Sequence, residues 1–430
     1  MCYPRMLELC PVLSFNDERN LNRLCAAARA RQRGISKKML YLDYAATTPL
    51  YEEVIDTIAE VMKEHYGNPS SIHQLGIQAE KLLNSSKQVI AGALGVLPAE
   101  IICTSGGTES NNLAIKGAVY SYQNRGKHLI TTQIEHASVK EVFLELEREG
   151  FRVTYLPVNS KGCVELETLQ AAITEDTILV SVMYVNNEVG TIQPIQEIGR
   201  WLAQYPKVLF HVDAVQGVAK LPFHPKEWGV DLCSASAHKF RGPKGVGFLY
   251  RREGVQLKPL LVGGGQEYGI RSGTENVPLI VGMAKALRLS VENLTAKIEH
   301  KYRLRRMIVD GISSIPELTL TGSEQQEEMA PHIVHFAFAG MKAEVVVHAL
   351  EQRQIYISTK SACASEESDP STVMLALGCS RERAVSGLRV SFSDEHQEKE
   401  IELFVVALRE VVKELAPMLG KSSVRRGNRR

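Results

Sequence analysis

DLCSASAHKFRGPKGVG, residues 231–247, is the stretch on which the interpretation of this chain depends. It begins as a short apolar strand, continues with small hydroxyl residues and ends in a turn rich in Gly and Pro. Lys239 therefore follows a strand end, where small neighbours leave room for a flat ring and two serine hydroxyls can hold an anion. A lysine that forms a Schiff base with pyridoxal phosphate (PLP) needs such surroundings. A surface lysine in a basic loop with Arg241 and Lys244 explains this stretch equally well on its own.

The overall composition is that of an ordinary globular protein. The chain has 430 residues, of which 44% are hydrophobic and 23% charged, a length that allows two or three domains. A formal net charge of +1 gives no electrostatic argument for a nucleic-acid or membrane partner. No apolar run is long enough for a transmembrane helix. The 8 cysteines are scattered without CxxC pairs, which argues against a zinc site or a disulfide scaffold and favours a reducing cytoplasm.

Strand-like and helix-like segments alternate through the first two thirds of the chain. The strand-like runs are EIICTSG, HLITTQ, RVTYLPV, TILVSVMYV and KVLFHVDA. This alternation predicts a mostly parallel sheet with helices on both faces, which binds ligands at the carboxyl ends of its strands. We therefore predict an α/β fold with a large domain over residues 39–290. A smaller α+β domain is expected over residues 291–420, where HIVHFAFAG and GLRVSFSD have strand patterns.

The two ends of the chain differ from the rest. Residues 1–38 show no clear period, lack a secretory h-region and contain acidic residues that a mitochondrial presequence would avoid. We interpret them as a poorly ordered extension, and we hypothesise an alternative start at Met39, directly before LYLDYAATTPL. Residues 421–430 form a basic tail that we expect to fray.

A glycine pair after the strand-like run EIIC suggests a phosphate site. In TSGGTESNN, residues 104–112, the glycines allow backbone N–H groups to approach an anion, and the helix that follows favours negative charge at its N-terminus. Gly107 and Thr108 are therefore candidate phosphate ligands. A glycine turn with a threonine N-cap is the common structural alternative.

Other polar residues at strand ends could bind the ring of the cofactor. Asp213, in HVDAVQG, follows a nearly continuous apolar run, and a carboxylate at that depth needs a cationic partner such as a protonated pyridine nitrogen. Gln216 and Asn187 could donate hydrogen bonds to the phenolic oxygen of the ring. His136, in QIEHASV, could stack on the ring and move protons, although a lone His is more often a helix N-terminal residue.

Taken together, the motifs resemble the class V aminotransferase-like, fold-type I PLP enzymes, and among these the cysteine desulfurases of the NifS/IscS type. The resemblance runs from Tyr41 to about Leu419 with the motifs in family order. The matching stretches are YLDYAATTPL, GNPSSIH, TSGGTESNN, EHASV, VNNEVGTIQPI, HVDAVQ, SAHKFRGPKGVG, GGGQEYGIRSGTENV, SACAS and LRVSFS.

The resemblance implies a role for each residue near the cofactor. Lys239 would carry PLP as a Schiff base, and Asp213 would pair with the pyridine nitrogen. Gln216 and Asn187 would flank the phenolic oxygen, and His136 would stack on the ring and assist proton transfer.

The resemblance also implies how phosphate and substrate are held. Thr108, Ser236 and His238 would bind the phosphate, and Thr274 would reach across from the second subunit of a homodimer. Arg389, with Asn68 nearby, would take the substrate carboxylate by a bidentate contact, which suits guanidinium geometry.

Cys363, in KSACASEESDP, matches the persulfide-forming cysteine of this family. The small residues, acids and Pro370 around it predict a loop rather than a core element. Family members often have Gly before SAC, whereas this chain has Lys360, which either lowers the pKa of the thiol or alters the hinging of the loop. We expect no stable metal site, with Cys363 open to a transient iron–sulfur contact.

These roles imply that L-cysteine gives its sulfur to Cys363 and leaves as L-alanine. The persulfide would then pass to an acceptor protein. This acceptor is either an iron–sulfur scaffold or a tRNA-thiolating enzyme, and the sequence does not decide between them. We expect a cytoplasmic homodimer with no direct nucleic-acid or membrane contact.

Three other functions remain to be weighed. A selenocysteine lyase would share every cofactor residue, so relative rates on cysteine and selenocysteine would decide. A catalytically silent PLP-fold scaffold for sulfur transfer would not need the intact set of Lys239, Asp213, His136 and Cys363. Transamination would leave Cys363 without a role.

Overall fold

The computed structural model describes residues 39–359 and 370–419. The described residues from Tyr41 onwards form one compact unit. The predicted extension, the basic tail, Lys360 and Cys363 lie outside the described residues, so the predictions made for them stay predictions.

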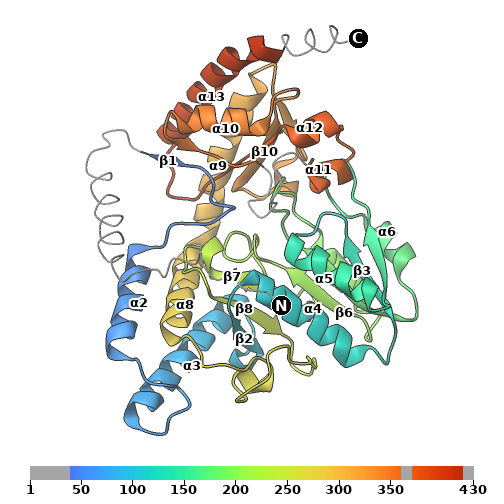
Figure 1. Ribbon diagram of the computed structural model, residues 1–430, viewed down its shortest axis with the longest axis vertical. Helices are drawn as coiled ribbons and strands as arrows, with labels where there is room; N and C mark the ends of the chain where they lie inside the picture. The colour runs from blue at the N-terminus through green and yellow to red at the C-terminus, as the bar shows by residue number, and fades with distance from the viewer. Residues whose placement is uncertain (1–38, 360–369, 420–430) are drawn as a thin grey trace, which may run out of the picture. The chain divides into compact units, whose positions relative to one another are not determined.

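A seven-stranded sheet organises the larger part of the chain (Figure 1), in the order β2-β8-β7-β6-β5-β3-β4. The pairs β3–β4, β3–β5, β5–β6 and β6–β7 are parallel, whereas β8 runs antiparallel to both β2 and β7. The predicted mostly parallel sheet is thus confirmed, and the five strand-like runs become its first five strands. The strands are β2 (Ile101–Thr104), β3 (His128–Thr132), β4 (Arg152–Leu156), β5 (Thr177–Met183), β6 (Leu209–Asp213), β7 (Leu232–Ser236) and β8 (Gly247–Arg251).

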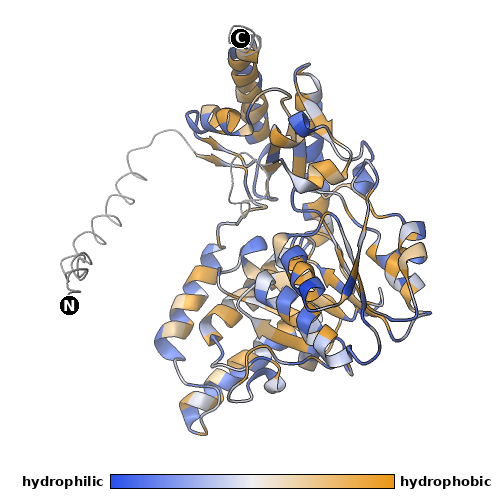
Figure 2. Cartoon of the chain, turned by 45° about the vertical axis from the view of Figure 1, so that its right-hand side comes forward, coloured by the Kyte–Doolittle hydropathy of each residue, from blue (hydrophilic) through white to orange (hydrophobic). Residues whose placement is uncertain are grey.

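Helices cover both faces of this sheet because successive strand residues alternate between two cores. Ile130 and Phe210 belong to the core packed under α3, α7 and α8, whereas their neighbours Leu129 and Leu209 belong to the core under α4 and α5. The central strands are accordingly apolar along most of their length (Figure 2). The helices of this part are α2 (Glu52–Glu64), α3 (Gln74–Leu94), α4 (Gly107–Tyr122), α5 (Ala137–Arg148), α6 (Leu166–Ala172), α7 (Ile195–Leu202) and α8 (Val277–Val291).

The region from α8 to α9 differs from the single long helical stretch that the sequence pattern suggests. The structure divides it into α8 and α9 (Leu294–Ser313), with Asn293 between them at a φ of 54°. Glu292 before it is extended, with a ψ of 125°, and Asn enters the left-handed region more readily than most residues, so these two residues interrupt the helix.

The C-terminal part contains a three-stranded antiparallel sheet, in the order β12-β10-β9. HIVHFAFAG and GLRVSFSD form β10 (Ile333–Ala337) and β12 (Gly387–Ser391), as predicted, and Arg389 pairs with His335 at their centre. The boundary between the two predicted domains stays a prediction. The remaining elements are β1 (Leu40–Tyr41), β9 (Thr319–Thr321), β11 (Ile355–Tyr356), α10 (Ala343–Glu351), α11 (Thr372–Ala376), α12 (Arg381–Val385), α13 (Glu398–Leu419) and the 3-10 helices η2 (Pro98–Glu100), η3 (Ala237–Lys239), η4 (Glu267–Gly269) and η5 (Gln326–Glu328).

None of the helices in the described ranges combines the length and apolar character needed to cross a membrane.

Two helical glycines allow a test of how closely α7 packs. A Cβ at Gly199 would lie 1.7 Å from the carbonyl oxygen of Trp228, whereas a Cβ at Gly92 in α3 would meet nothing within 4 Å. Gly199→Ala should therefore lower the free energy of unfolding by about 1–3 kcal/mol through overpacking. Gly92→Ala should raise it by up to about 1 kcal/mol through helix propensity. Denaturant unfolding of both variants measures the difference, and equal effects would show that α7 does not pack as described.

Candidate active site

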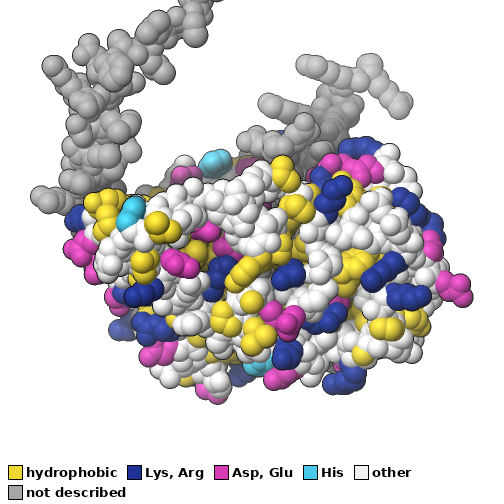
Figure 3. Space-filling view, turned by 90° about the horizontal axis from the view of Figure 1, so that it is seen from below, with side chains coloured by type: hydrophobic (Ala, Val, Ile, Leu, Met, Phe, Trp, Pro, Cys, Tyr) yellow, Lys and Arg dark blue, Asp and Glu magenta, His cyan; other side chains and the backbone are white. Residues whose placement is uncertain are grey.

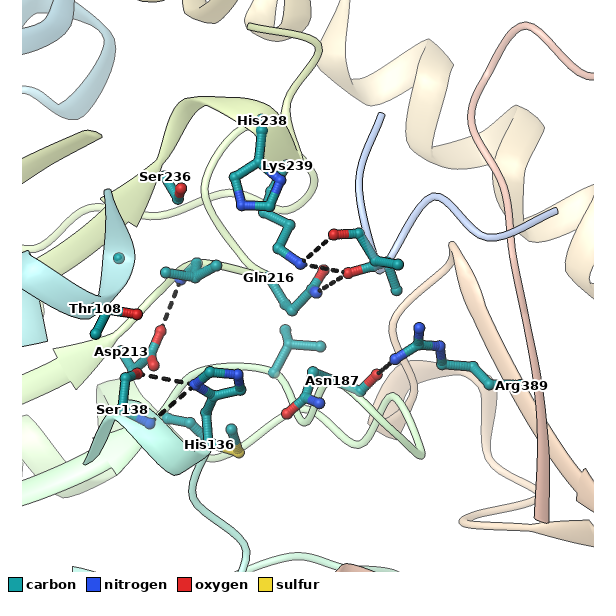
Figure 4. Close-up of a pocket in the computed structure, with 16 residues that line it drawn as sticks. Thr108, His136, Ser138, Asn187, Asp213, Gln216, Ser236, His238, Lys239 and Arg389 are labelled. Carbon is teal, nitrogen blue, oxygen red and sulfur yellow. Dashed lines mark hydrogen bonds between the residues drawn. The ribbon is translucent and has the colours of Figure 1, made fainter. Parts of the chain in front are cut away.

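A cavity of ≈ 170 Å³ lies at the carboxyl ends of β5 and β6 and at the first turns of α4 and α5 (Figure 4). Parallel strands bring the residues that follow them to one edge of the sheet, so side chains distant in sequence meet here. The cavity is lined by most of the site residues that the sequence predicts: Gly107, Thr108, His136, Asn187, Asp213, Gln216, Ser236, His238, Lys239 and Arg389.

Lys239 ends η3, the short helix that follows β7. Its Nζ donates hydrogen bonds to the carbonyl oxygens of Ala45 (2.6 Å) and Ala46 (2.8 Å). The ammonium group is therefore held at the cavity wall rather than in bulk water, which excludes the alternative of a lysine in a solvated basic loop.

Asp213 is the last residue of β6 and is 5% exposed. One carboxylate oxygen accepts from Asn111 Nδ2 (2.8 Å) and the other from the backbone N–H of Val215 (3.0 Å). Among the described residues, no ion pair includes Asp213. A buried carboxylate is stable beside a cation, and the cavity leaves space for one.

His136 caps α5 with its own side chain. Nδ1 accepts the backbone N–H of Ser138 (3.1 Å), and Ser138 Oγ lies 2.8 Å from the same nitrogen. A ring nitrogen that accepts from an amide carries no proton, so the proton of the neutral ring is on Nε2. Asn111 Nδ2 also donates to Ser138 Oγ (2.9 Å), so one amide connects the residues that hold His136 to the carboxylate of Asp213.

The first turn of α4 forms an anion cradle. A Cβ at Gly107 would lie 2.8 Å from Val215 Cγ2, and Gly106 has a φ of 149°, so both positions are suited to glycine. The N–H groups that begin a helix have no partner within it and favour an anion. Thr108, Ser236 and His238 line the cavity at this end (Figure 4). Burial, and then the charge of Lys239, lower the pKa of His238 to about 4, so its imidazole is neutral at pH 7.

Gln216 lies between two lysines. Its Oε1 accepts from Lys220 Nζ (2.6 Å), and its Nε2 donates to the same Ala45 carbonyl that Lys239 contacts (2.9 Å). These two bonds set the orientation of the amide and leave the second N–H of Nε2 for a ligand. Burial lowers the pKa of Lys220 well below its usual value.

Arg389 closes the cavity from β12. It is 1% exposed, and it donates to the carbonyl oxygen of Asn187 (2.8 Å) and to Asp43 Oδ1 (2.9 Å). A guanidinium has five N–H donors, so these two bonds leave donors for a carboxylate.

Two predicted residues lie elsewhere in the single chain. Asn68 is exposed in the loop between α2 and α3, where its Oδ1 accepts from Ser70 N (2.9 Å). Thr274 lines a separate cavity with Cys103, Glu267 and Arg271. Their expected roles, like that of Cys363, stay predictions.

Sequence reasoning missed three residues that support this site: Asn111, Ser138 and Lys220. Asn111 and Lys220 carry no signal of their own, since a buried amide or lysine is recognised only from its neighbours. Ser138 did carry a sequence signal, because a Ser two residues after a helix-capping His is placed to contact that ring.

The comparisons with known proteins agree with the geometry. The family model Aminotransferase class-V matches residues 40–404. The chain belongs to the class V aminotransferase family. The resemblance stated from the motifs is thus confirmed, and so is PLP as the cofactor.

Individual relatives match along nearly their whole length. A protein named NifS/IcsS protein homolog from Lactobacillus delbrueckii subsp. bulgaricus is 46% identical over 374 residues, 87% of this chain and 97% of the relative. A Clostridium botulinum protein named cysteine desulfurase IscS is 42% identical over 382 residues, 89% of this chain and 96% of the relative. A solved structure titled NifS-like protein superposes with a TM-score of 0.83 at 38% identity and covers 88% of this chain and 100% of its own.

The buried carboxyl group of Glu135, next to His136, makes the stability of the fold depend on pH. Glu135 Oε1 accepts from Thr132 Oγ1 (2.7 Å) and from the backbone N–H of Met183 (2.9 Å), whereas Oε2 is buried with no hydrogen-bond partner among the residues that the structure describes. Burial raises the pKa of Glu135 to about 8, with a smaller contribution from the charge of Asp213, so the side chain is protonated at pH 7.

Glu135→Gln should therefore flatten the pH-dependence of stability between pH 4.5, the ordinary pKa, and about pH 8. In this window the native state binds a proton that the unfolded state has lost, so stability falls as pH rises, by at most roughly 1.4 kcal/mol per pH unit. Unfolding free energies measured across the window test this. Glu141→Gln, at an exposed position of α5, is the control, and identical pH profiles for both variants would contradict the assignment.

Proposed function

We propose that the protein is a PLP-dependent cysteine desulfurase, which removes sulfur from L-cysteine, releases L-alanine and holds the sulfur as a persulfide on Cys363. One observation carries the proposal: the amine of Lys239, the carboxylate of Asp213 and the imidazole of His136 line one cavity. The name of the Clostridium botulinum relative, cysteine desulfurase IscS, supports this choice of activity.

The cavity fits the cofactor at each of its polar groups. The buried carboxylate of Asp213 suits a protonated pyridine nitrogen, the first turn of α4 with Thr108 and Ser236 suits a phosphate, and Gln216 keeps one N–H for the phenolic oxygen. When bound through Lys239, PLP supplies an electron sink for a carbanion at the substrate α-carbon.

Lys239 and His136 would move the protons of the reaction. The amine of Lys239, when it is not bound to the cofactor, would be a base within the cavity and would remove the α-proton of the substrate. The carbonyls of Ala45 and Ala46, which hold Nζ, stabilise the ammonium that results. His136 offers an N–H at Nε2, because Nδ1 accepts from Ser138, so it is suited to donate a hydrogen bond at the face of the ring.

Arg389 would bind the carboxylate of L-cysteine. Its place on β12 is fixed by backbone pairing with β10, and its contacts with Asn187 and Asp43 hold the guanidinium in one orientation. A preorganised guanidinium loses little freedom on binding a carboxylate. Asn68 is proposed as a second contact.

The chain enters the Cys363 segment beside this arginine. Ser358 N donates to Arg389 O (3.1 Å), and Arg389 N donates to Ser358 O (2.8 Å). Cys363 follows Ser358 by five residues in the sequence, which limits the distance between their Cα atoms to about 18 Å. The thiolate of Cys363 would attack the sulfur of the substrate. The C–S bond breaks with its electron pair left on carbon, and protonation of that carbon completes alanine.

A homodimer would complete the site. Thr274 lies outside the cavity of its own chain, which agrees with a contact to the cavity of a second subunit. Exposed apolar side chains such as Ile72, Leu75, Val262 and Tyr268 occur on α3 and on the loops near it. Hydrophobic side chains are spread over the face viewed in Figure 3, among acidic and basic ones.

The persulfide would pass to a sulfur-acceptor protein, either an iron–sulfur scaffold or a tRNA-thiolating enzyme. The scattered cysteines support a reducing compartment, and we propose the cytoplasm.

Lys239→Ala should abolish the visible absorbance of the lysine-bound cofactor and lower alanine release from L-cysteine by at least about 10²-fold, the usual contribution of a general base. Absorbance spectra and alanine release measure both effects. Lys244→Ala, an exposed lysine of the same loop, serves as the control. Normal turnover in the Lys239 variant would disprove the proposed function.

Cys363→Ser should keep the bound cofactor and its spectrum but lose alanine release from L-cysteine, because Ser forms no persulfide. Cys379→Ser is a matched control, since Cys379 lies between α11 and α12 and has no proposed role. Desulfuration at the parent rate in the Cys363 variant would show that another group accepts the sulfur. A parallel assay with selenocysteine separates the desulfurase from a selenocysteine lyase.

A further inference from the structure

Lys239 also lines a second cavity, of ≈ 40 Å³, which shares no other lining residue with the first. Its wall is formed by residues after β6, by η3, by α9 and by the segments before β10 and after β12. A water molecule requires roughly 10–15 Å³ of such space, so the cavity has room for a small ion or a few waters.

The ionisable groups that line this second cavity are mostly basic, and burial lowers the pKa of both Lys220 and His332 well below its usual value. They are Lys220, Lys239, Arg241, Lys297, Lys301 and His332, against the single carboxylate of Asp394. Four of the basic groups already have acceptors: Lys239 donates to the carbonyls of Ala45 and Ala46, Lys220 donates to Gln216, Lys297 donates to the carbonyl of Leu289 (2.7 Å), and Arg241 pairs with Glu395.

Lys301 and His332 face the cavity without such partners. Lys301 is 4% exposed, and its ammonium makes no hydrogen bond or ion pair with the described residues. His332 is 2% exposed, and both of its ring nitrogens are buried without a hydrogen-bond partner in the part of the chain that the structure describes. Burial lowers the pKa of Lys301 to about 8, so the ammonium still carries its charge at pH 7. A buried charge and a buried ring N–H both require an acceptor.

We propose that this cavity binds a small monovalent inorganic anion, of the size of chloride, between Lys301 and His332. The ammonium supplies charge and up to three N–H donors, and the imidazole supplies one. Asp394 lines the same cavity and its charge favours the ammonium form of Lys301, but it forms no ion pair with Lys301 within the described ranges, so the N–H donors of Lys301 stay open to an anion. The site does not depend on the proposed function.

The position of the anion has a consequence for Lys239, which rests on the proposed function. A negative charge beside an amine favours its protonated form, so the bound anion would raise the pH at which the lysine-bound cofactor changes its absorbance. An anion in the second cavity would thus change the pH range in which Lys239 acts as a base.

Crystals of the holoenzyme grown with bromide in place of chloride test the site directly. We expect an anomalous peak in the second cavity within hydrogen-bonding distance of Lys301 Nζ. In solution, chloride should raise the melting temperature of the holoenzyme in a saturable manner at constant ionic strength, with isethionate as the bulky replacement anion, because ligand binding to the native state stabilises it. A cavity that contains only water in bromide crystals would overturn the proposal.

Lys301→Met keeps the length of the side chain and removes its charge, and it should abolish both the bromide peak and the saturable chloride effect. Arg303→Met removes the same charge from an exposed position of α9 and should keep both. His332→Asn provides a second variant should Lys301→Met not fold, with weaker chloride dependence expected. An equal chloride response in the Lys301 and Arg303 variants would exclude the site. A shift of melting temperature without a shift of the cofactor absorbance would retain the site and remove only its link to Lys239.

Discussion

The burial of one carboxylate at the end of a central strand determines much of this structure. Asp213 lies at the bottom of the cavity, and its two oxygens are held by an amide from α4 and by the backbone after β6. The same amide of Asn111 reaches Ser138 and, through it, the imidazole of His136. The negative charge of Asp213 is buried and has no cationic partner among the described residues, so the cavity favours a ligand with a positive group. In the proposed function, the position of the cofactor ring follows from this carboxylate.

The opposite wall of the cavity is set by backbone carbonyls. Ala45 and Ala46 hold the amine of Lys239, and Ala45 also accepts from Gln216. A chain of polar contacts therefore runs from Lys220 through Gln216 and Ala45 to Lys239. Because Lys220 and Lys239 both line the second cavity, the two cavities share one electrostatic environment even though they share a single lining residue.

The sequence predicted the sheet and most of the cavity because both follow from local rules. Strand ends in a parallel sheet meet at one edge, so Asp213, His136 and Lys239 could be placed together from the pattern alone. Asn111 and Lys220 could not, since their partners are set by tertiary packing. The break between α8 and α9 was missed because Glu292 and Asn293 leave the helical conformation without interrupting the apolar period. The roles expected of Thr274 and Asn68 stay predictions, because neither residue lines this cavity in the single chain.

The ion pair between Asp43 and Arg389 joins residues 346 positions apart. One partner emerges from the ribosome near the beginning of synthesis and the other near its end. Contacts of such sequence separation form late, after the loops between them have closed. A nascent chain that is released early would thus carry the sheet and Lys239 but not Arg389, so the proposed contact to the substrate carboxylate is the last part of the cavity that the folding polypeptide acquires.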